Sequence, residues 1–137
     1  MSTDTGIADR VEIADLFAHL ANLLDEHRYD DAVRVYHPDL VVRSPRGGEI
    51  HGLDEAIAYM KRSRVEGVAS QHVHGDVLVE VDGDSAKATA NQLVYFWREG
   101  EPPHENSGLR TSATVVRTAE GWRFKEVAIA LAWQIKA

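Results

Sequence analysis

The chain contains no cysteine among its 137 residues. Disulfide bonds and thiolate metal sites are therefore excluded, and the composition is compatible with a reducing cytosol, so we expect a cytoplasmic protein. The 44% apolar and 7% aromatic content is ordinary for a domain that buries its own core without a covalent crosslink.

Positive charge is also scarce. Lys and Arg number 15 against 22 Asp and Glu, which gives a formal net charge of -7 at pH 7. Nucleic acid and anionic membranes require a clustered positive surface, so neither is expected as a partner. No apolar run approaches the roughly 18 residues that a membrane span needs. We expect a single domain over residues 1–137, in which the polar residues 1–6 form a disordered tail and not a signal peptide.

The first half of the chain is predicted to be mainly helical. Over residues 7–26, apolar side chains recur every three or four positions and predict an amphipathic helix. Shorter helices are predicted over residues 29–36 and 53–64. Between these two, residues 40–43 predict a brief strand, and the turn-rich residues 44–48 predict a loop.

The second half is predicted to consist of strands. An Asp-Gly-Asp turn at residues 82–84 predicts a hairpin between residues 77–81 and 85–98, with residues 70–76 as an irregular, histidine-bearing approach. Two further strands are predicted over residues 109–117 and 122–134. This order predicts an α+β fold in which a curved, antiparallel sheet wraps over three N-terminal helices.

Alternation within residues 85–98 separates two strand faces. The face with smaller side chains is predicted to point inward and carries Ala86, Ala88, Ala90, Gln92, Val94 and Phe96. The outer face carries Thr89, Asn91, Leu93, Tyr95 and Trp97. This outer face is too apolar for free solvent, so we expect a homodimer through the sheet.

One acidic residue of the first helix follows a row of small side chains. Ala14, Ala18 and Ala21 recur at helical spacing, and the row ends at Asp25. The small residues leave space, so Asp25 could face a cavity at the margin of the core. Alternatively, Asp25 belongs with Glu26 to a solvated helix end, and the pattern leaves both interpretations open.

Six segments occur together in an order that resembles one family: residues 13–17, 25–31, 36–39, 52–57, 70–86 and 121–124. Taken together they resemble the SnoaL-like branch of the nuclear transport factor 2-like superfamily. The resemblance covers nearly the whole chain and implies a cone-shaped fold with a mainly antiparallel sheet around a pocket. The superfamily includes polyketide cyclases, scytalone dehydratase, steroid isomerase and hexachlorocyclohexane dehydrochlorinase, so the fold alone does not settle the function.

The resemblance also implies a catalytic pair. Asp25 and His72 are placed like the aspartate and histidine of the dehydratase and dehydrochlorinase members. Arg117, in preference to Arg110, is the nearest match to an arginine of the dehydrochlorinase. A histidine can take a proton at neutral pH, and a carboxylate on its other ring nitrogen fixes the tautomer. The alternative for a histidine in a strand is a structural role.

The implied pocket would bind a small hydrophobic molecule. Gln92 could orient a substrate carbonyl and Arg117 could stabilise developing negative charge, while His74 has a supporting or structural role. The residues expected to contact the substrate are Phe17, Ala21, His74, Gln92, Val94 and Phe96.

We therefore expect a cofactor-independent lyase, isomerase or cyclase that acts on an apolar, ring-containing metabolite. The alternative is a noncatalytic ligand-binding or dimerisation module of the same fold. His72, His74 and Asp76 lack the spacing of known zinc signatures, so no metal is expected.

Overall fold

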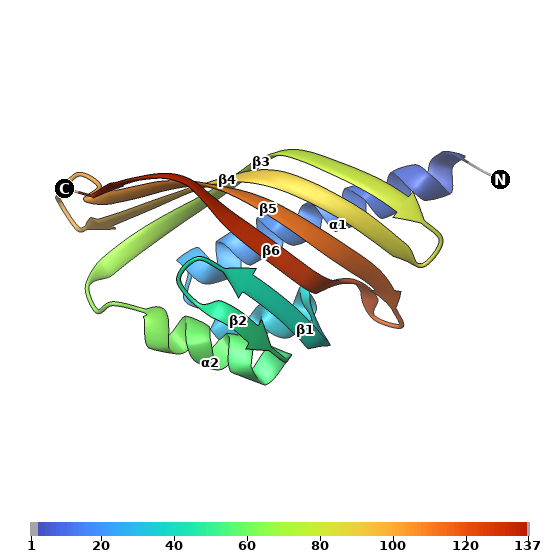
Figure 1. The fold of residues 1–137 in the computed structure, drawn as a ribbon, viewed down its shortest axis with the longest axis horizontal. Coiled ribbons are helices and arrows are strands. Elements are labelled where there is room, and N and C mark those ends of the chain that lie inside the picture. Colours follow the sequence, from blue (N-terminus) through green and yellow to red (C-terminus); the bar gives the residue numbers. More distant parts are fainter. Residues whose placement is uncertain (1–2, 137) are drawn as a thin grey trace.

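The computed structural model describes residues 3–136, which form an α+β domain (Figure 1). The fold class predicted from the sequence is confirmed. In chain order the elements are helix α1 (Thr3–Asp25), the 3-10 helix η1 (Tyr29–Arg34), strands β1 (Tyr36–Ser44) and β2 (Gly48–His51), helix α2 (Leu53–Ser63), and strands β3 (Val68–Asp82), β4 (Ser85–Arg98), β5 (Glu105–Thr118) and β6 (Gly121–Lys136).

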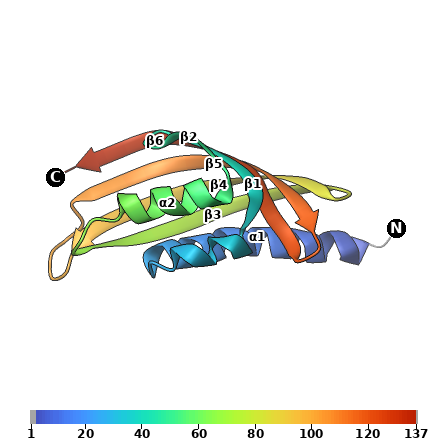
Figure 2. The same cartoon turned by 90° about the horizontal axis from the view of Figure 1, so that it is seen from below.

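The strands form one curved sheet in the order β2-β1-β6-β5-β4-β3. Neighbouring strands are antiparallel, except that β1 runs parallel to β6. Helix α1 runs beneath the sheet along its length, and η1 and α2 lie on the same side (Figures 1 and 2). Within residues 3–136, no helix is both long and apolar enough to cross a membrane.

The core lies between α1 and the concave face of the sheet. The predicted apolar stripe of α1 supplies Ile13, Leu16, Phe17 and Leu20, all buried. Phe17 meets Phe124 of β6 edge to face, with ring centroids 4.9 Å apart, an arrangement that aromatic pairs favour. The helix is therefore fixed to the sheet by its apolar stripe rather than by its intrinsic helix propensity.

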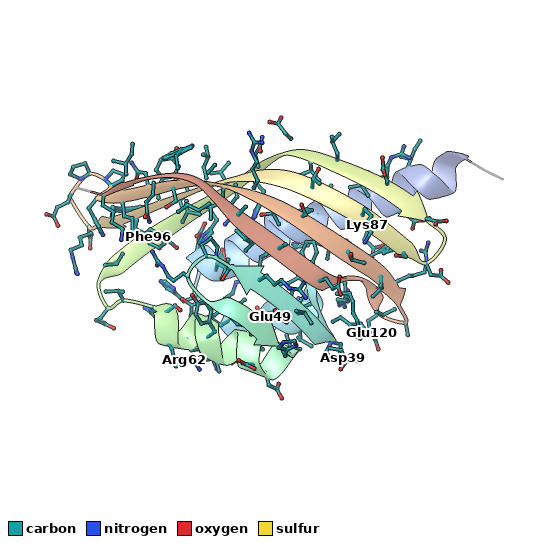
Figure 3. All side chains as sticks on the ribbon, in the orientation of Figure 1. Asp39, Glu49, Arg62, Lys87, Phe96 and Glu120 are labelled. Carbon is teal, nitrogen blue, oxygen red and sulfur yellow. The ribbon has the colours of Figure 1, made fainter. Side chains whose placement is uncertain are left out.

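The β3–β4 hairpin agrees closely with the sequence pattern. Asp82 pairs with Ser85 across the turn, where Gly83 adopts a φ of 64° that suits glycine. On β4 the residues predicted to face inward are buried from Ala86 to Val94, and the alternating residues are exposed as far as Leu93. Lys87 lies on the outer face and donates a 2.7 Å hydrogen bond to Thr114 of β5 (Figure 3).

Several predicted boundaries are wrong. Residues 70–76 are not an irregular approach, because β3 begins at Val68 and its pairing with β4 shifts only between Gly75 and Leu78. The second helix ends at Arg34, and the strand predicted over residues 40–43 covers Tyr36–Ser44 because β6 and β2 pair with it on either side.

The chain termini and one short strand add further differences. Strand β2 (Gly48–His51) was not predicted, since four residues carry too little alternation to identify. Of the tail expected at residues 1–6, the backbone of residues 3–6 belongs to α1, and residues 1–2 lie outside the described residues.

Candidate functional site

Asp25 and His72 meet where the end of α1 packs against β3. The carboxylate atom Oδ1 of Asp25 lies 2.6 Å from Nδ1 of His72. The other oxygen, Oδ2, accepts a 2.8 Å hydrogen bond from the backbone N–H of His72. The hydroxyl of Ser70 donates to Oδ1 at 3.0 Å. The carboxylate is thus held by three donors from one strand, which fixes its position relative to the imidazole.

The chain reverses directly after Asp25 in a well-formed helix end. The N–H of Arg28 bonds to the carbonyl of Leu23 at 2.8 Å, and the N–H of His27 bonds to the carbonyl of Leu24 at 3.2 Å. This pair of bonds is the Schellman pattern, in which one residue past the helix takes a left-handed conformation. Here that residue is His27, with a φ of 58°. The sharp reversal leaves Asp25 in the last helical turn, facing β3.

Asp25 remains ionised at neutral pH. Burial alone would raise the pKa of its carboxyl, but the hydrogen bonds from the His72 side chain, the His72 backbone and Ser70 outweigh burial, so the pKa lies below its ordinary value. A carboxylate only accepts hydrogen bonds, so Nδ1 of His72 carries the proton. In the neutral ring the other nitrogen, Nε2, is then free to accept a proton.

A small cavity of about 60 Å³ lies under the concave face of the sheet, lined in part by Leu24 and His74, which are close in the chain to Asp25 and His72. Its walls are mostly apolar, and its polar groups come from Tyr36, His74, Gln92 and Thr111. Thr111 donates a 3.2 Å hydrogen bond to Oε1 of Gln92. The residues around the cavity are Phe17, Leu20, Leu24, Tyr36, His74, Gln92, Thr111, Phe124, Val127 and Ile129.

His74 is uncharged at neutral pH. Burial and the neighbouring His72 lower its pKa to about 4, although contacts with the Gln92 side chain and the Phe17 backbone act in the opposite direction. Its ring lies 5.5 Å from that of Phe17, centroid to centroid. The cavity is therefore lined by a neutral imidazole and not by an imidazolium.

The residues predicted to contact a substrate fall into two groups. Phe17, His74 and Gln92 line the cavity together. Val94 and Phe96 lie outside this lining, where they pair with His72 and Ser70 on the adjacent strand. Ala21 is buried one helical turn before Asp25. The small-residue row does not line a cavity as expected, because Ala18 is exposed.

Several residues around the site were not identified from the sequence. Leu20 and Leu24 follow Phe17 at helical spacing, so the apolar stripe contained a signal for both. Ser70 has the same strand parity as His72, a signal that depends on β3 beginning before residue 70. Tyr36 on β1 and Thr111 on β5 reach the cavity because both strands pair with β6. Local sequence does not determine this pairing.

Arg117 is not close to the Asp25 and His72 pair. Its guanidinium donates two hydrogen bonds of 2.9 Å to Asp9 and one of 3.0 Å to Asp84. Its Cζ atom also lies 4.6 Å from the ring centre of Trp122. Asp9 precedes Asp25 by 16 positions on α1, roughly 24 Å along the helix axis. The proposed contact of Arg117 with a substrate at the pair is therefore incorrect, because its acidic neighbours hold it at the other end of the helix.

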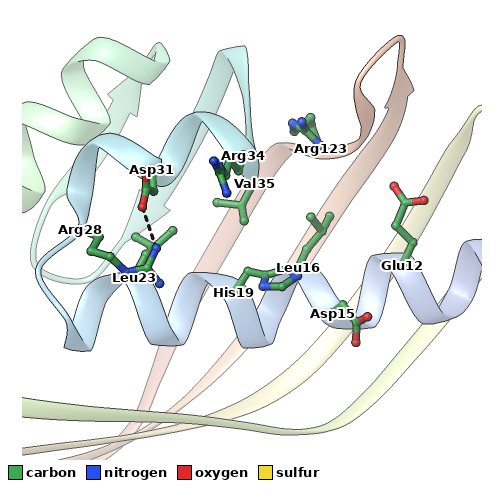
Figure 4. Close-up of a pocket in the computed structure, with 10 residues that line it drawn as sticks. All are labelled: Glu12, Asp15, Leu16, His19, Leu23, Arg28, Asp31, Arg34, Val35 and Arg123. Atoms are coloured by element: carbon green, nitrogen blue, oxygen red, sulfur yellow. Dashed lines mark hydrogen bonds and ion pairs between the residues drawn. The ribbon is translucent and has the colours of Figure 1, made fainter.

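A larger hollow of about 300 Å³ lies between α1, η1 and the start of β6 (Figure 4). Its lining is strongly charged and includes Glu12, Asp15 and Arg123, with Arg28 and Asp31 joined by a 2.6 Å ion pair. Neither Asp25 nor His72 lines this hollow or the smaller cavity, but the smaller cavity is lined by Leu24, next to Asp25, and by His74, two positions from His72. The mixed charges of this hollow suit an apolar substrate poorly, so we take the smaller cavity as the candidate site.

No three His, Asp or Glu side chains within residues 3–136 are placed to hold a metal ion together. Asp76, which follows His74 at a strand irregularity, instead accepts a 2.9 Å hydrogen bond from Asn91.

Comparisons with known proteins agree with the architecture. A sequence model described as a SnoaL-like domain matches residues 5–128. An uncharacterized protein of Mycobacterium tuberculosis is 32% identical over 122 residues, which cover 85% of this chain and 81% of that protein. An uncharacterized protein of Mycobacterium bovis has the same identity and coverage.

Solved structures resemble the fold at lower identity. A protein of Kribbella flavida has a TM-score of 0.85 at 24% identity, covering 94% of each chain. A type 2 hexachlorocyclohexane dehydrochlorinase has a TM-score of 0.85 at 15% identity, covering 99% of this chain and 93% of the other. The ActVI-ORFA protein of Streptomyces coelicolor has a TM-score of 0.79 at 17% identity, and the match covers 89% of this chain and 96% of the other.

Proposed function

Because the chain belongs to the SnoaL-like domain family, we propose that it is a cofactor-independent lyase, isomerase or cyclase with His72 as general base and Asp25 as its partner. The observation that carries this proposal is the 2.6 Å contact between Oδ1 of Asp25 and Nδ1 of His72. The contact leaves Nε2 of His72 able to take a proton from a substrate. The substrate class is a small, mostly apolar ring compound, since the adjoining cavity has mainly apolar walls.

The proposed chemistry begins with removal of a proton from carbon. Nε2 of His72 forms the new N–H bond, and the electron pair of the broken C–H bond stays on the substrate. That pair then expels a leaving group, moves into conjugation and is reprotonated, or attacks a carbonyl carbon, which gives elimination, isomerisation or ring closure respectively. In each case Asp25 stabilises the imidazolium that forms. A hexachlorocyclohexane dehydrochlorinase of similar fold supports elimination as the first class to test.

The experiment compares wild type with His72→Gln and Asp25→Asn. The substrates are ring compounds with a C–H bond next to a carbonyl or a halogen, and products are separated by chromatography. We expect His72→Gln to reduce turnover by roughly 10²- to 10⁴-fold, the usual contribution of a general base. His19→Gln is the matched control, because His19 lies on the exposed side of α1 in the larger hollow. Turnover by His72→Gln equal to that of wild type excludes the proposed base.

One observation favours a noncatalytic ligand-binding module as the second candidate. The cavity of about 60 Å³ is small beside the roughly 300 to 1,000 Å³ typical of ligand sites. A binding module would bind ring compounds without converting any of them, and His72→Gln would leave that binding unchanged.

We also propose a homodimer through the outer face of the sheet. One row crosses four strands on this face, where Val73 pairs with Leu93, Leu93 with Gly108, and Gly108 with Trp133. The side chains of Val73, Leu93 and Trp133 are 43%, 36% and 45% exposed, an unusual amount for adjacent apolar groups. Pairing two copies through this row would remove it from water.

A further inference from the structure

One polar atom in the cavity is buried without a partner. Nδ1 of His74 is shielded from solvent and makes no hydrogen bond within the described residues 3–136. A buried polar group without a hydrogen bond is destabilising, so such atoms are rare in folded proteins. The position of the atom is informative, because the ring that carries it lines the cavity.

The neighbouring polar groups do not relieve this cost. Gln92 accepts a hydrogen bond from Thr111, its diagonal neighbour on β5, and although the Gln92 side chain also acts on the His74 ring, it makes no hydrogen bond with Nδ1. The other polar side chains around the cavity are those of Tyr36 and Thr111, and neither makes a hydrogen bond with Nδ1 of His74. A substrate group bound in the cavity would supply the hydrogen-bond partner that Nδ1 of His74 lacks.

We propose that His74 binds an uncharged oxygen of the substrate, a carbonyl or hydroxyl group, and thereby selects neutral oxygen-bearing ring compounds over hydrocarbons and carboxylates. This inference rests on the proposed function, since it names the substrate class of the same site. His74 acts as a binding residue here, whereas His72 acts on the proton.

The charge of the cavity accounts for the preference for neutral groups. None of the ten residues around the cavity is Asp, Glu, Lys or Arg. A carboxylate that enters would lose its hydration without gaining a countercharge, which is far more costly than burial of a carbonyl or hydroxyl. Because the pKa of His74 is about 4, the ring is neutral at pH 7 and supplies no such charge.

The spacing of the two histidines fits a single small substrate. His72 and His74 are two positions apart on β3, so their side chains share a face at about 7 Å between Cα atoms. A ring compound can span that distance with its oxygen at His74 and its reacting C–H bond at His72. The narrow cavity then receives only the polar end, while the rest of the ring lies toward the Asp25 and His72 pair.

The experiment uses three probes of similar shape with the intact protein. Acetophenone carries a carbonyl oxygen, α-methylstyrene carries a CH₂ group in its place, and benzoate carries a charged carboxylate. We expect wild type at pH 7 to bind acetophenone roughly tenfold more tightly than α-methylstyrene, the effect of one buried hydrogen bond, and to bind benzoate most weakly. His74→Phe should reduce this preference to about onefold, and His19→Phe in the larger hollow should preserve it.

A spectroscopic measurement avoids any dependence on how well the variant folds. In wild-type protein labelled with ¹⁵N, acetophenone should shift the Nδ1 resonance of His74 and α-methylstyrene should not. Equal binding of acetophenone and α-methylstyrene, tighter binding of benzoate, or an unchanged Nδ1 resonance overturns the inference. If only water occupies the cavity, acetophenone and α-methylstyrene bind equally well. The preference should persist in His72→Gln, so loss of turnover and failure of this inference remain distinguishable.

Discussion

His72 contacts Asp25 twice, through its ring atom Nδ1 at 2.6 Å and through its backbone N–H at 2.8 Å, and the two contacts reach different oxygens of one carboxylate. The backbone contact fixes the carboxylate relative to β3, and the ring contact then fixes the imidazole relative to the carboxylate. Side-chain exposure of only 14% for His72 and 20% for Asp25 limits competition from water. The orientation of the ring therefore depends on the position of the helix end.

The first prediction concerns Asp25→Asn. Asn has one acceptor oxygen where Asp has two. Its NH₂ group would therefore face either the His72 backbone N–H or the Ser70 hydroxyl, each of which donates to Asp25 in wild type. We expect the free energy of unfolding to fall by about 1.5 to 3 kcal/mol, the value of a hydrogen bond to a charged group. Urea denaturation at pH 7 measures this change.

The control for this variant is Asp15→Asn, which changes an exposed carboxylate of the same helix that takes no part in the Asp25 contacts. If both variants lose the same stability, the carboxylate of Asp25 contributes nothing specific. Ring ¹⁵N shifts of His72 provide a second check, because an Asp25→Asn amide whose NH₂ group faces Nδ1 would favour the tautomer protonated at Nε2.

The sequence predicted most of the fold, because its strongest signals were local. The apolar stripe of α1 and the Asp-Gly turn before Ser85 each determine structure over a few residues. Strand β2 and the parallel pairing of β1 with β6 were not predicted. The pairing of β1 with β6 joins segments far apart in the chain, which no short-range pattern specifies, whereas β2 pairs with the adjacent β1 but has only four residues.

The site was predictable only in part. Asp25 and His72 were paired through a resemblance, and the structure brings the two side chains into contact. Arg117 was matched through the same resemblance, but its guanidinium is bonded to Asp9 at the other end of α1. The unpartnered Nδ1 of His74 has no sequence signal at all, since it depends on packing around one atom.

The second prediction concerns the other end of α1. Arg117 and Asp9, 108 positions apart, form two parallel hydrogen bonds of 2.9 Å, and Trp122 donates to the same carboxylate at 3.1 Å. The guanidinium holds the pKa of Asp9 below its ordinary value. Arg117→Lys keeps the charge but loses the planar guanidinium, whose two N–H groups pair with the two carboxylate oxygens. We therefore expect a melting temperature lower by several degrees.

Arg110→Lys is the matched control, since Arg110 is an exposed arginine of the same strand. Trp122 fluorescence reports on the local change, because its indole packs against the Arg117 guanidinium. An Arg117→Lys protein with the melting temperature and emission of wild type would show that charge alone anchors the helix.

The third prediction tests the helix end that positions Asp25. His27 has a φ of 58°, which costs an ordinary residue about 1 to 2 kcal/mol and glycine very little. Its ring Nδ1 lies 2.9 Å from the Tyr29 hydroxyl, so both variants must lack that contact for a fair comparison. We expect His27→Gly to be more stable than His27→Val by about 1 kcal/mol in urea denaturation. Equal stabilities would mean that the chain reversal does not require the left-handed conformation.

The fourth prediction is a loss of stability in mild acid that depends on His74. Its pKa is about 4 in the folded protein against an ordinary 6.5, so the unfolded chain binds the additional proton between these values. Stability is therefore complete above about pH 6.5 and falls as the pH decreases toward 4, by about 3 kcal/mol in total. The lowered carboxyl pKa of Asp25 acts only below its ordinary value of 3.8, outside this window.

Urea denaturation at pH 7 and pH 4.5 measures this dependence on pH. His74→Gln cannot take up the proton and should show a smaller difference between the two pH values, whereas His19→Gln should behave like wild type. An undiminished difference in His74→Gln would assign the acid sensitivity to another group.

The fifth prediction tests the proposed dimer. A Cβ atom at Gly108 would overlap the Trp133 ring, so this ring lies directly over Gly108 of β5. It thereby extends the apolar row that begins at Leu93. Leu93→Glu would place a charge in the centre of that row, which a buried interface cannot accommodate without a partner. We expect wild type to sediment as a dimer at micromolar concentration and Leu93→Glu as a monomer with an unchanged circular dichroism spectrum. Val33→Glu, at an exposed valine of η1 away from the sheet, should remain dimeric. A wild-type monomer at this concentration would contradict the dimer, and the exposed row would then need another explanation.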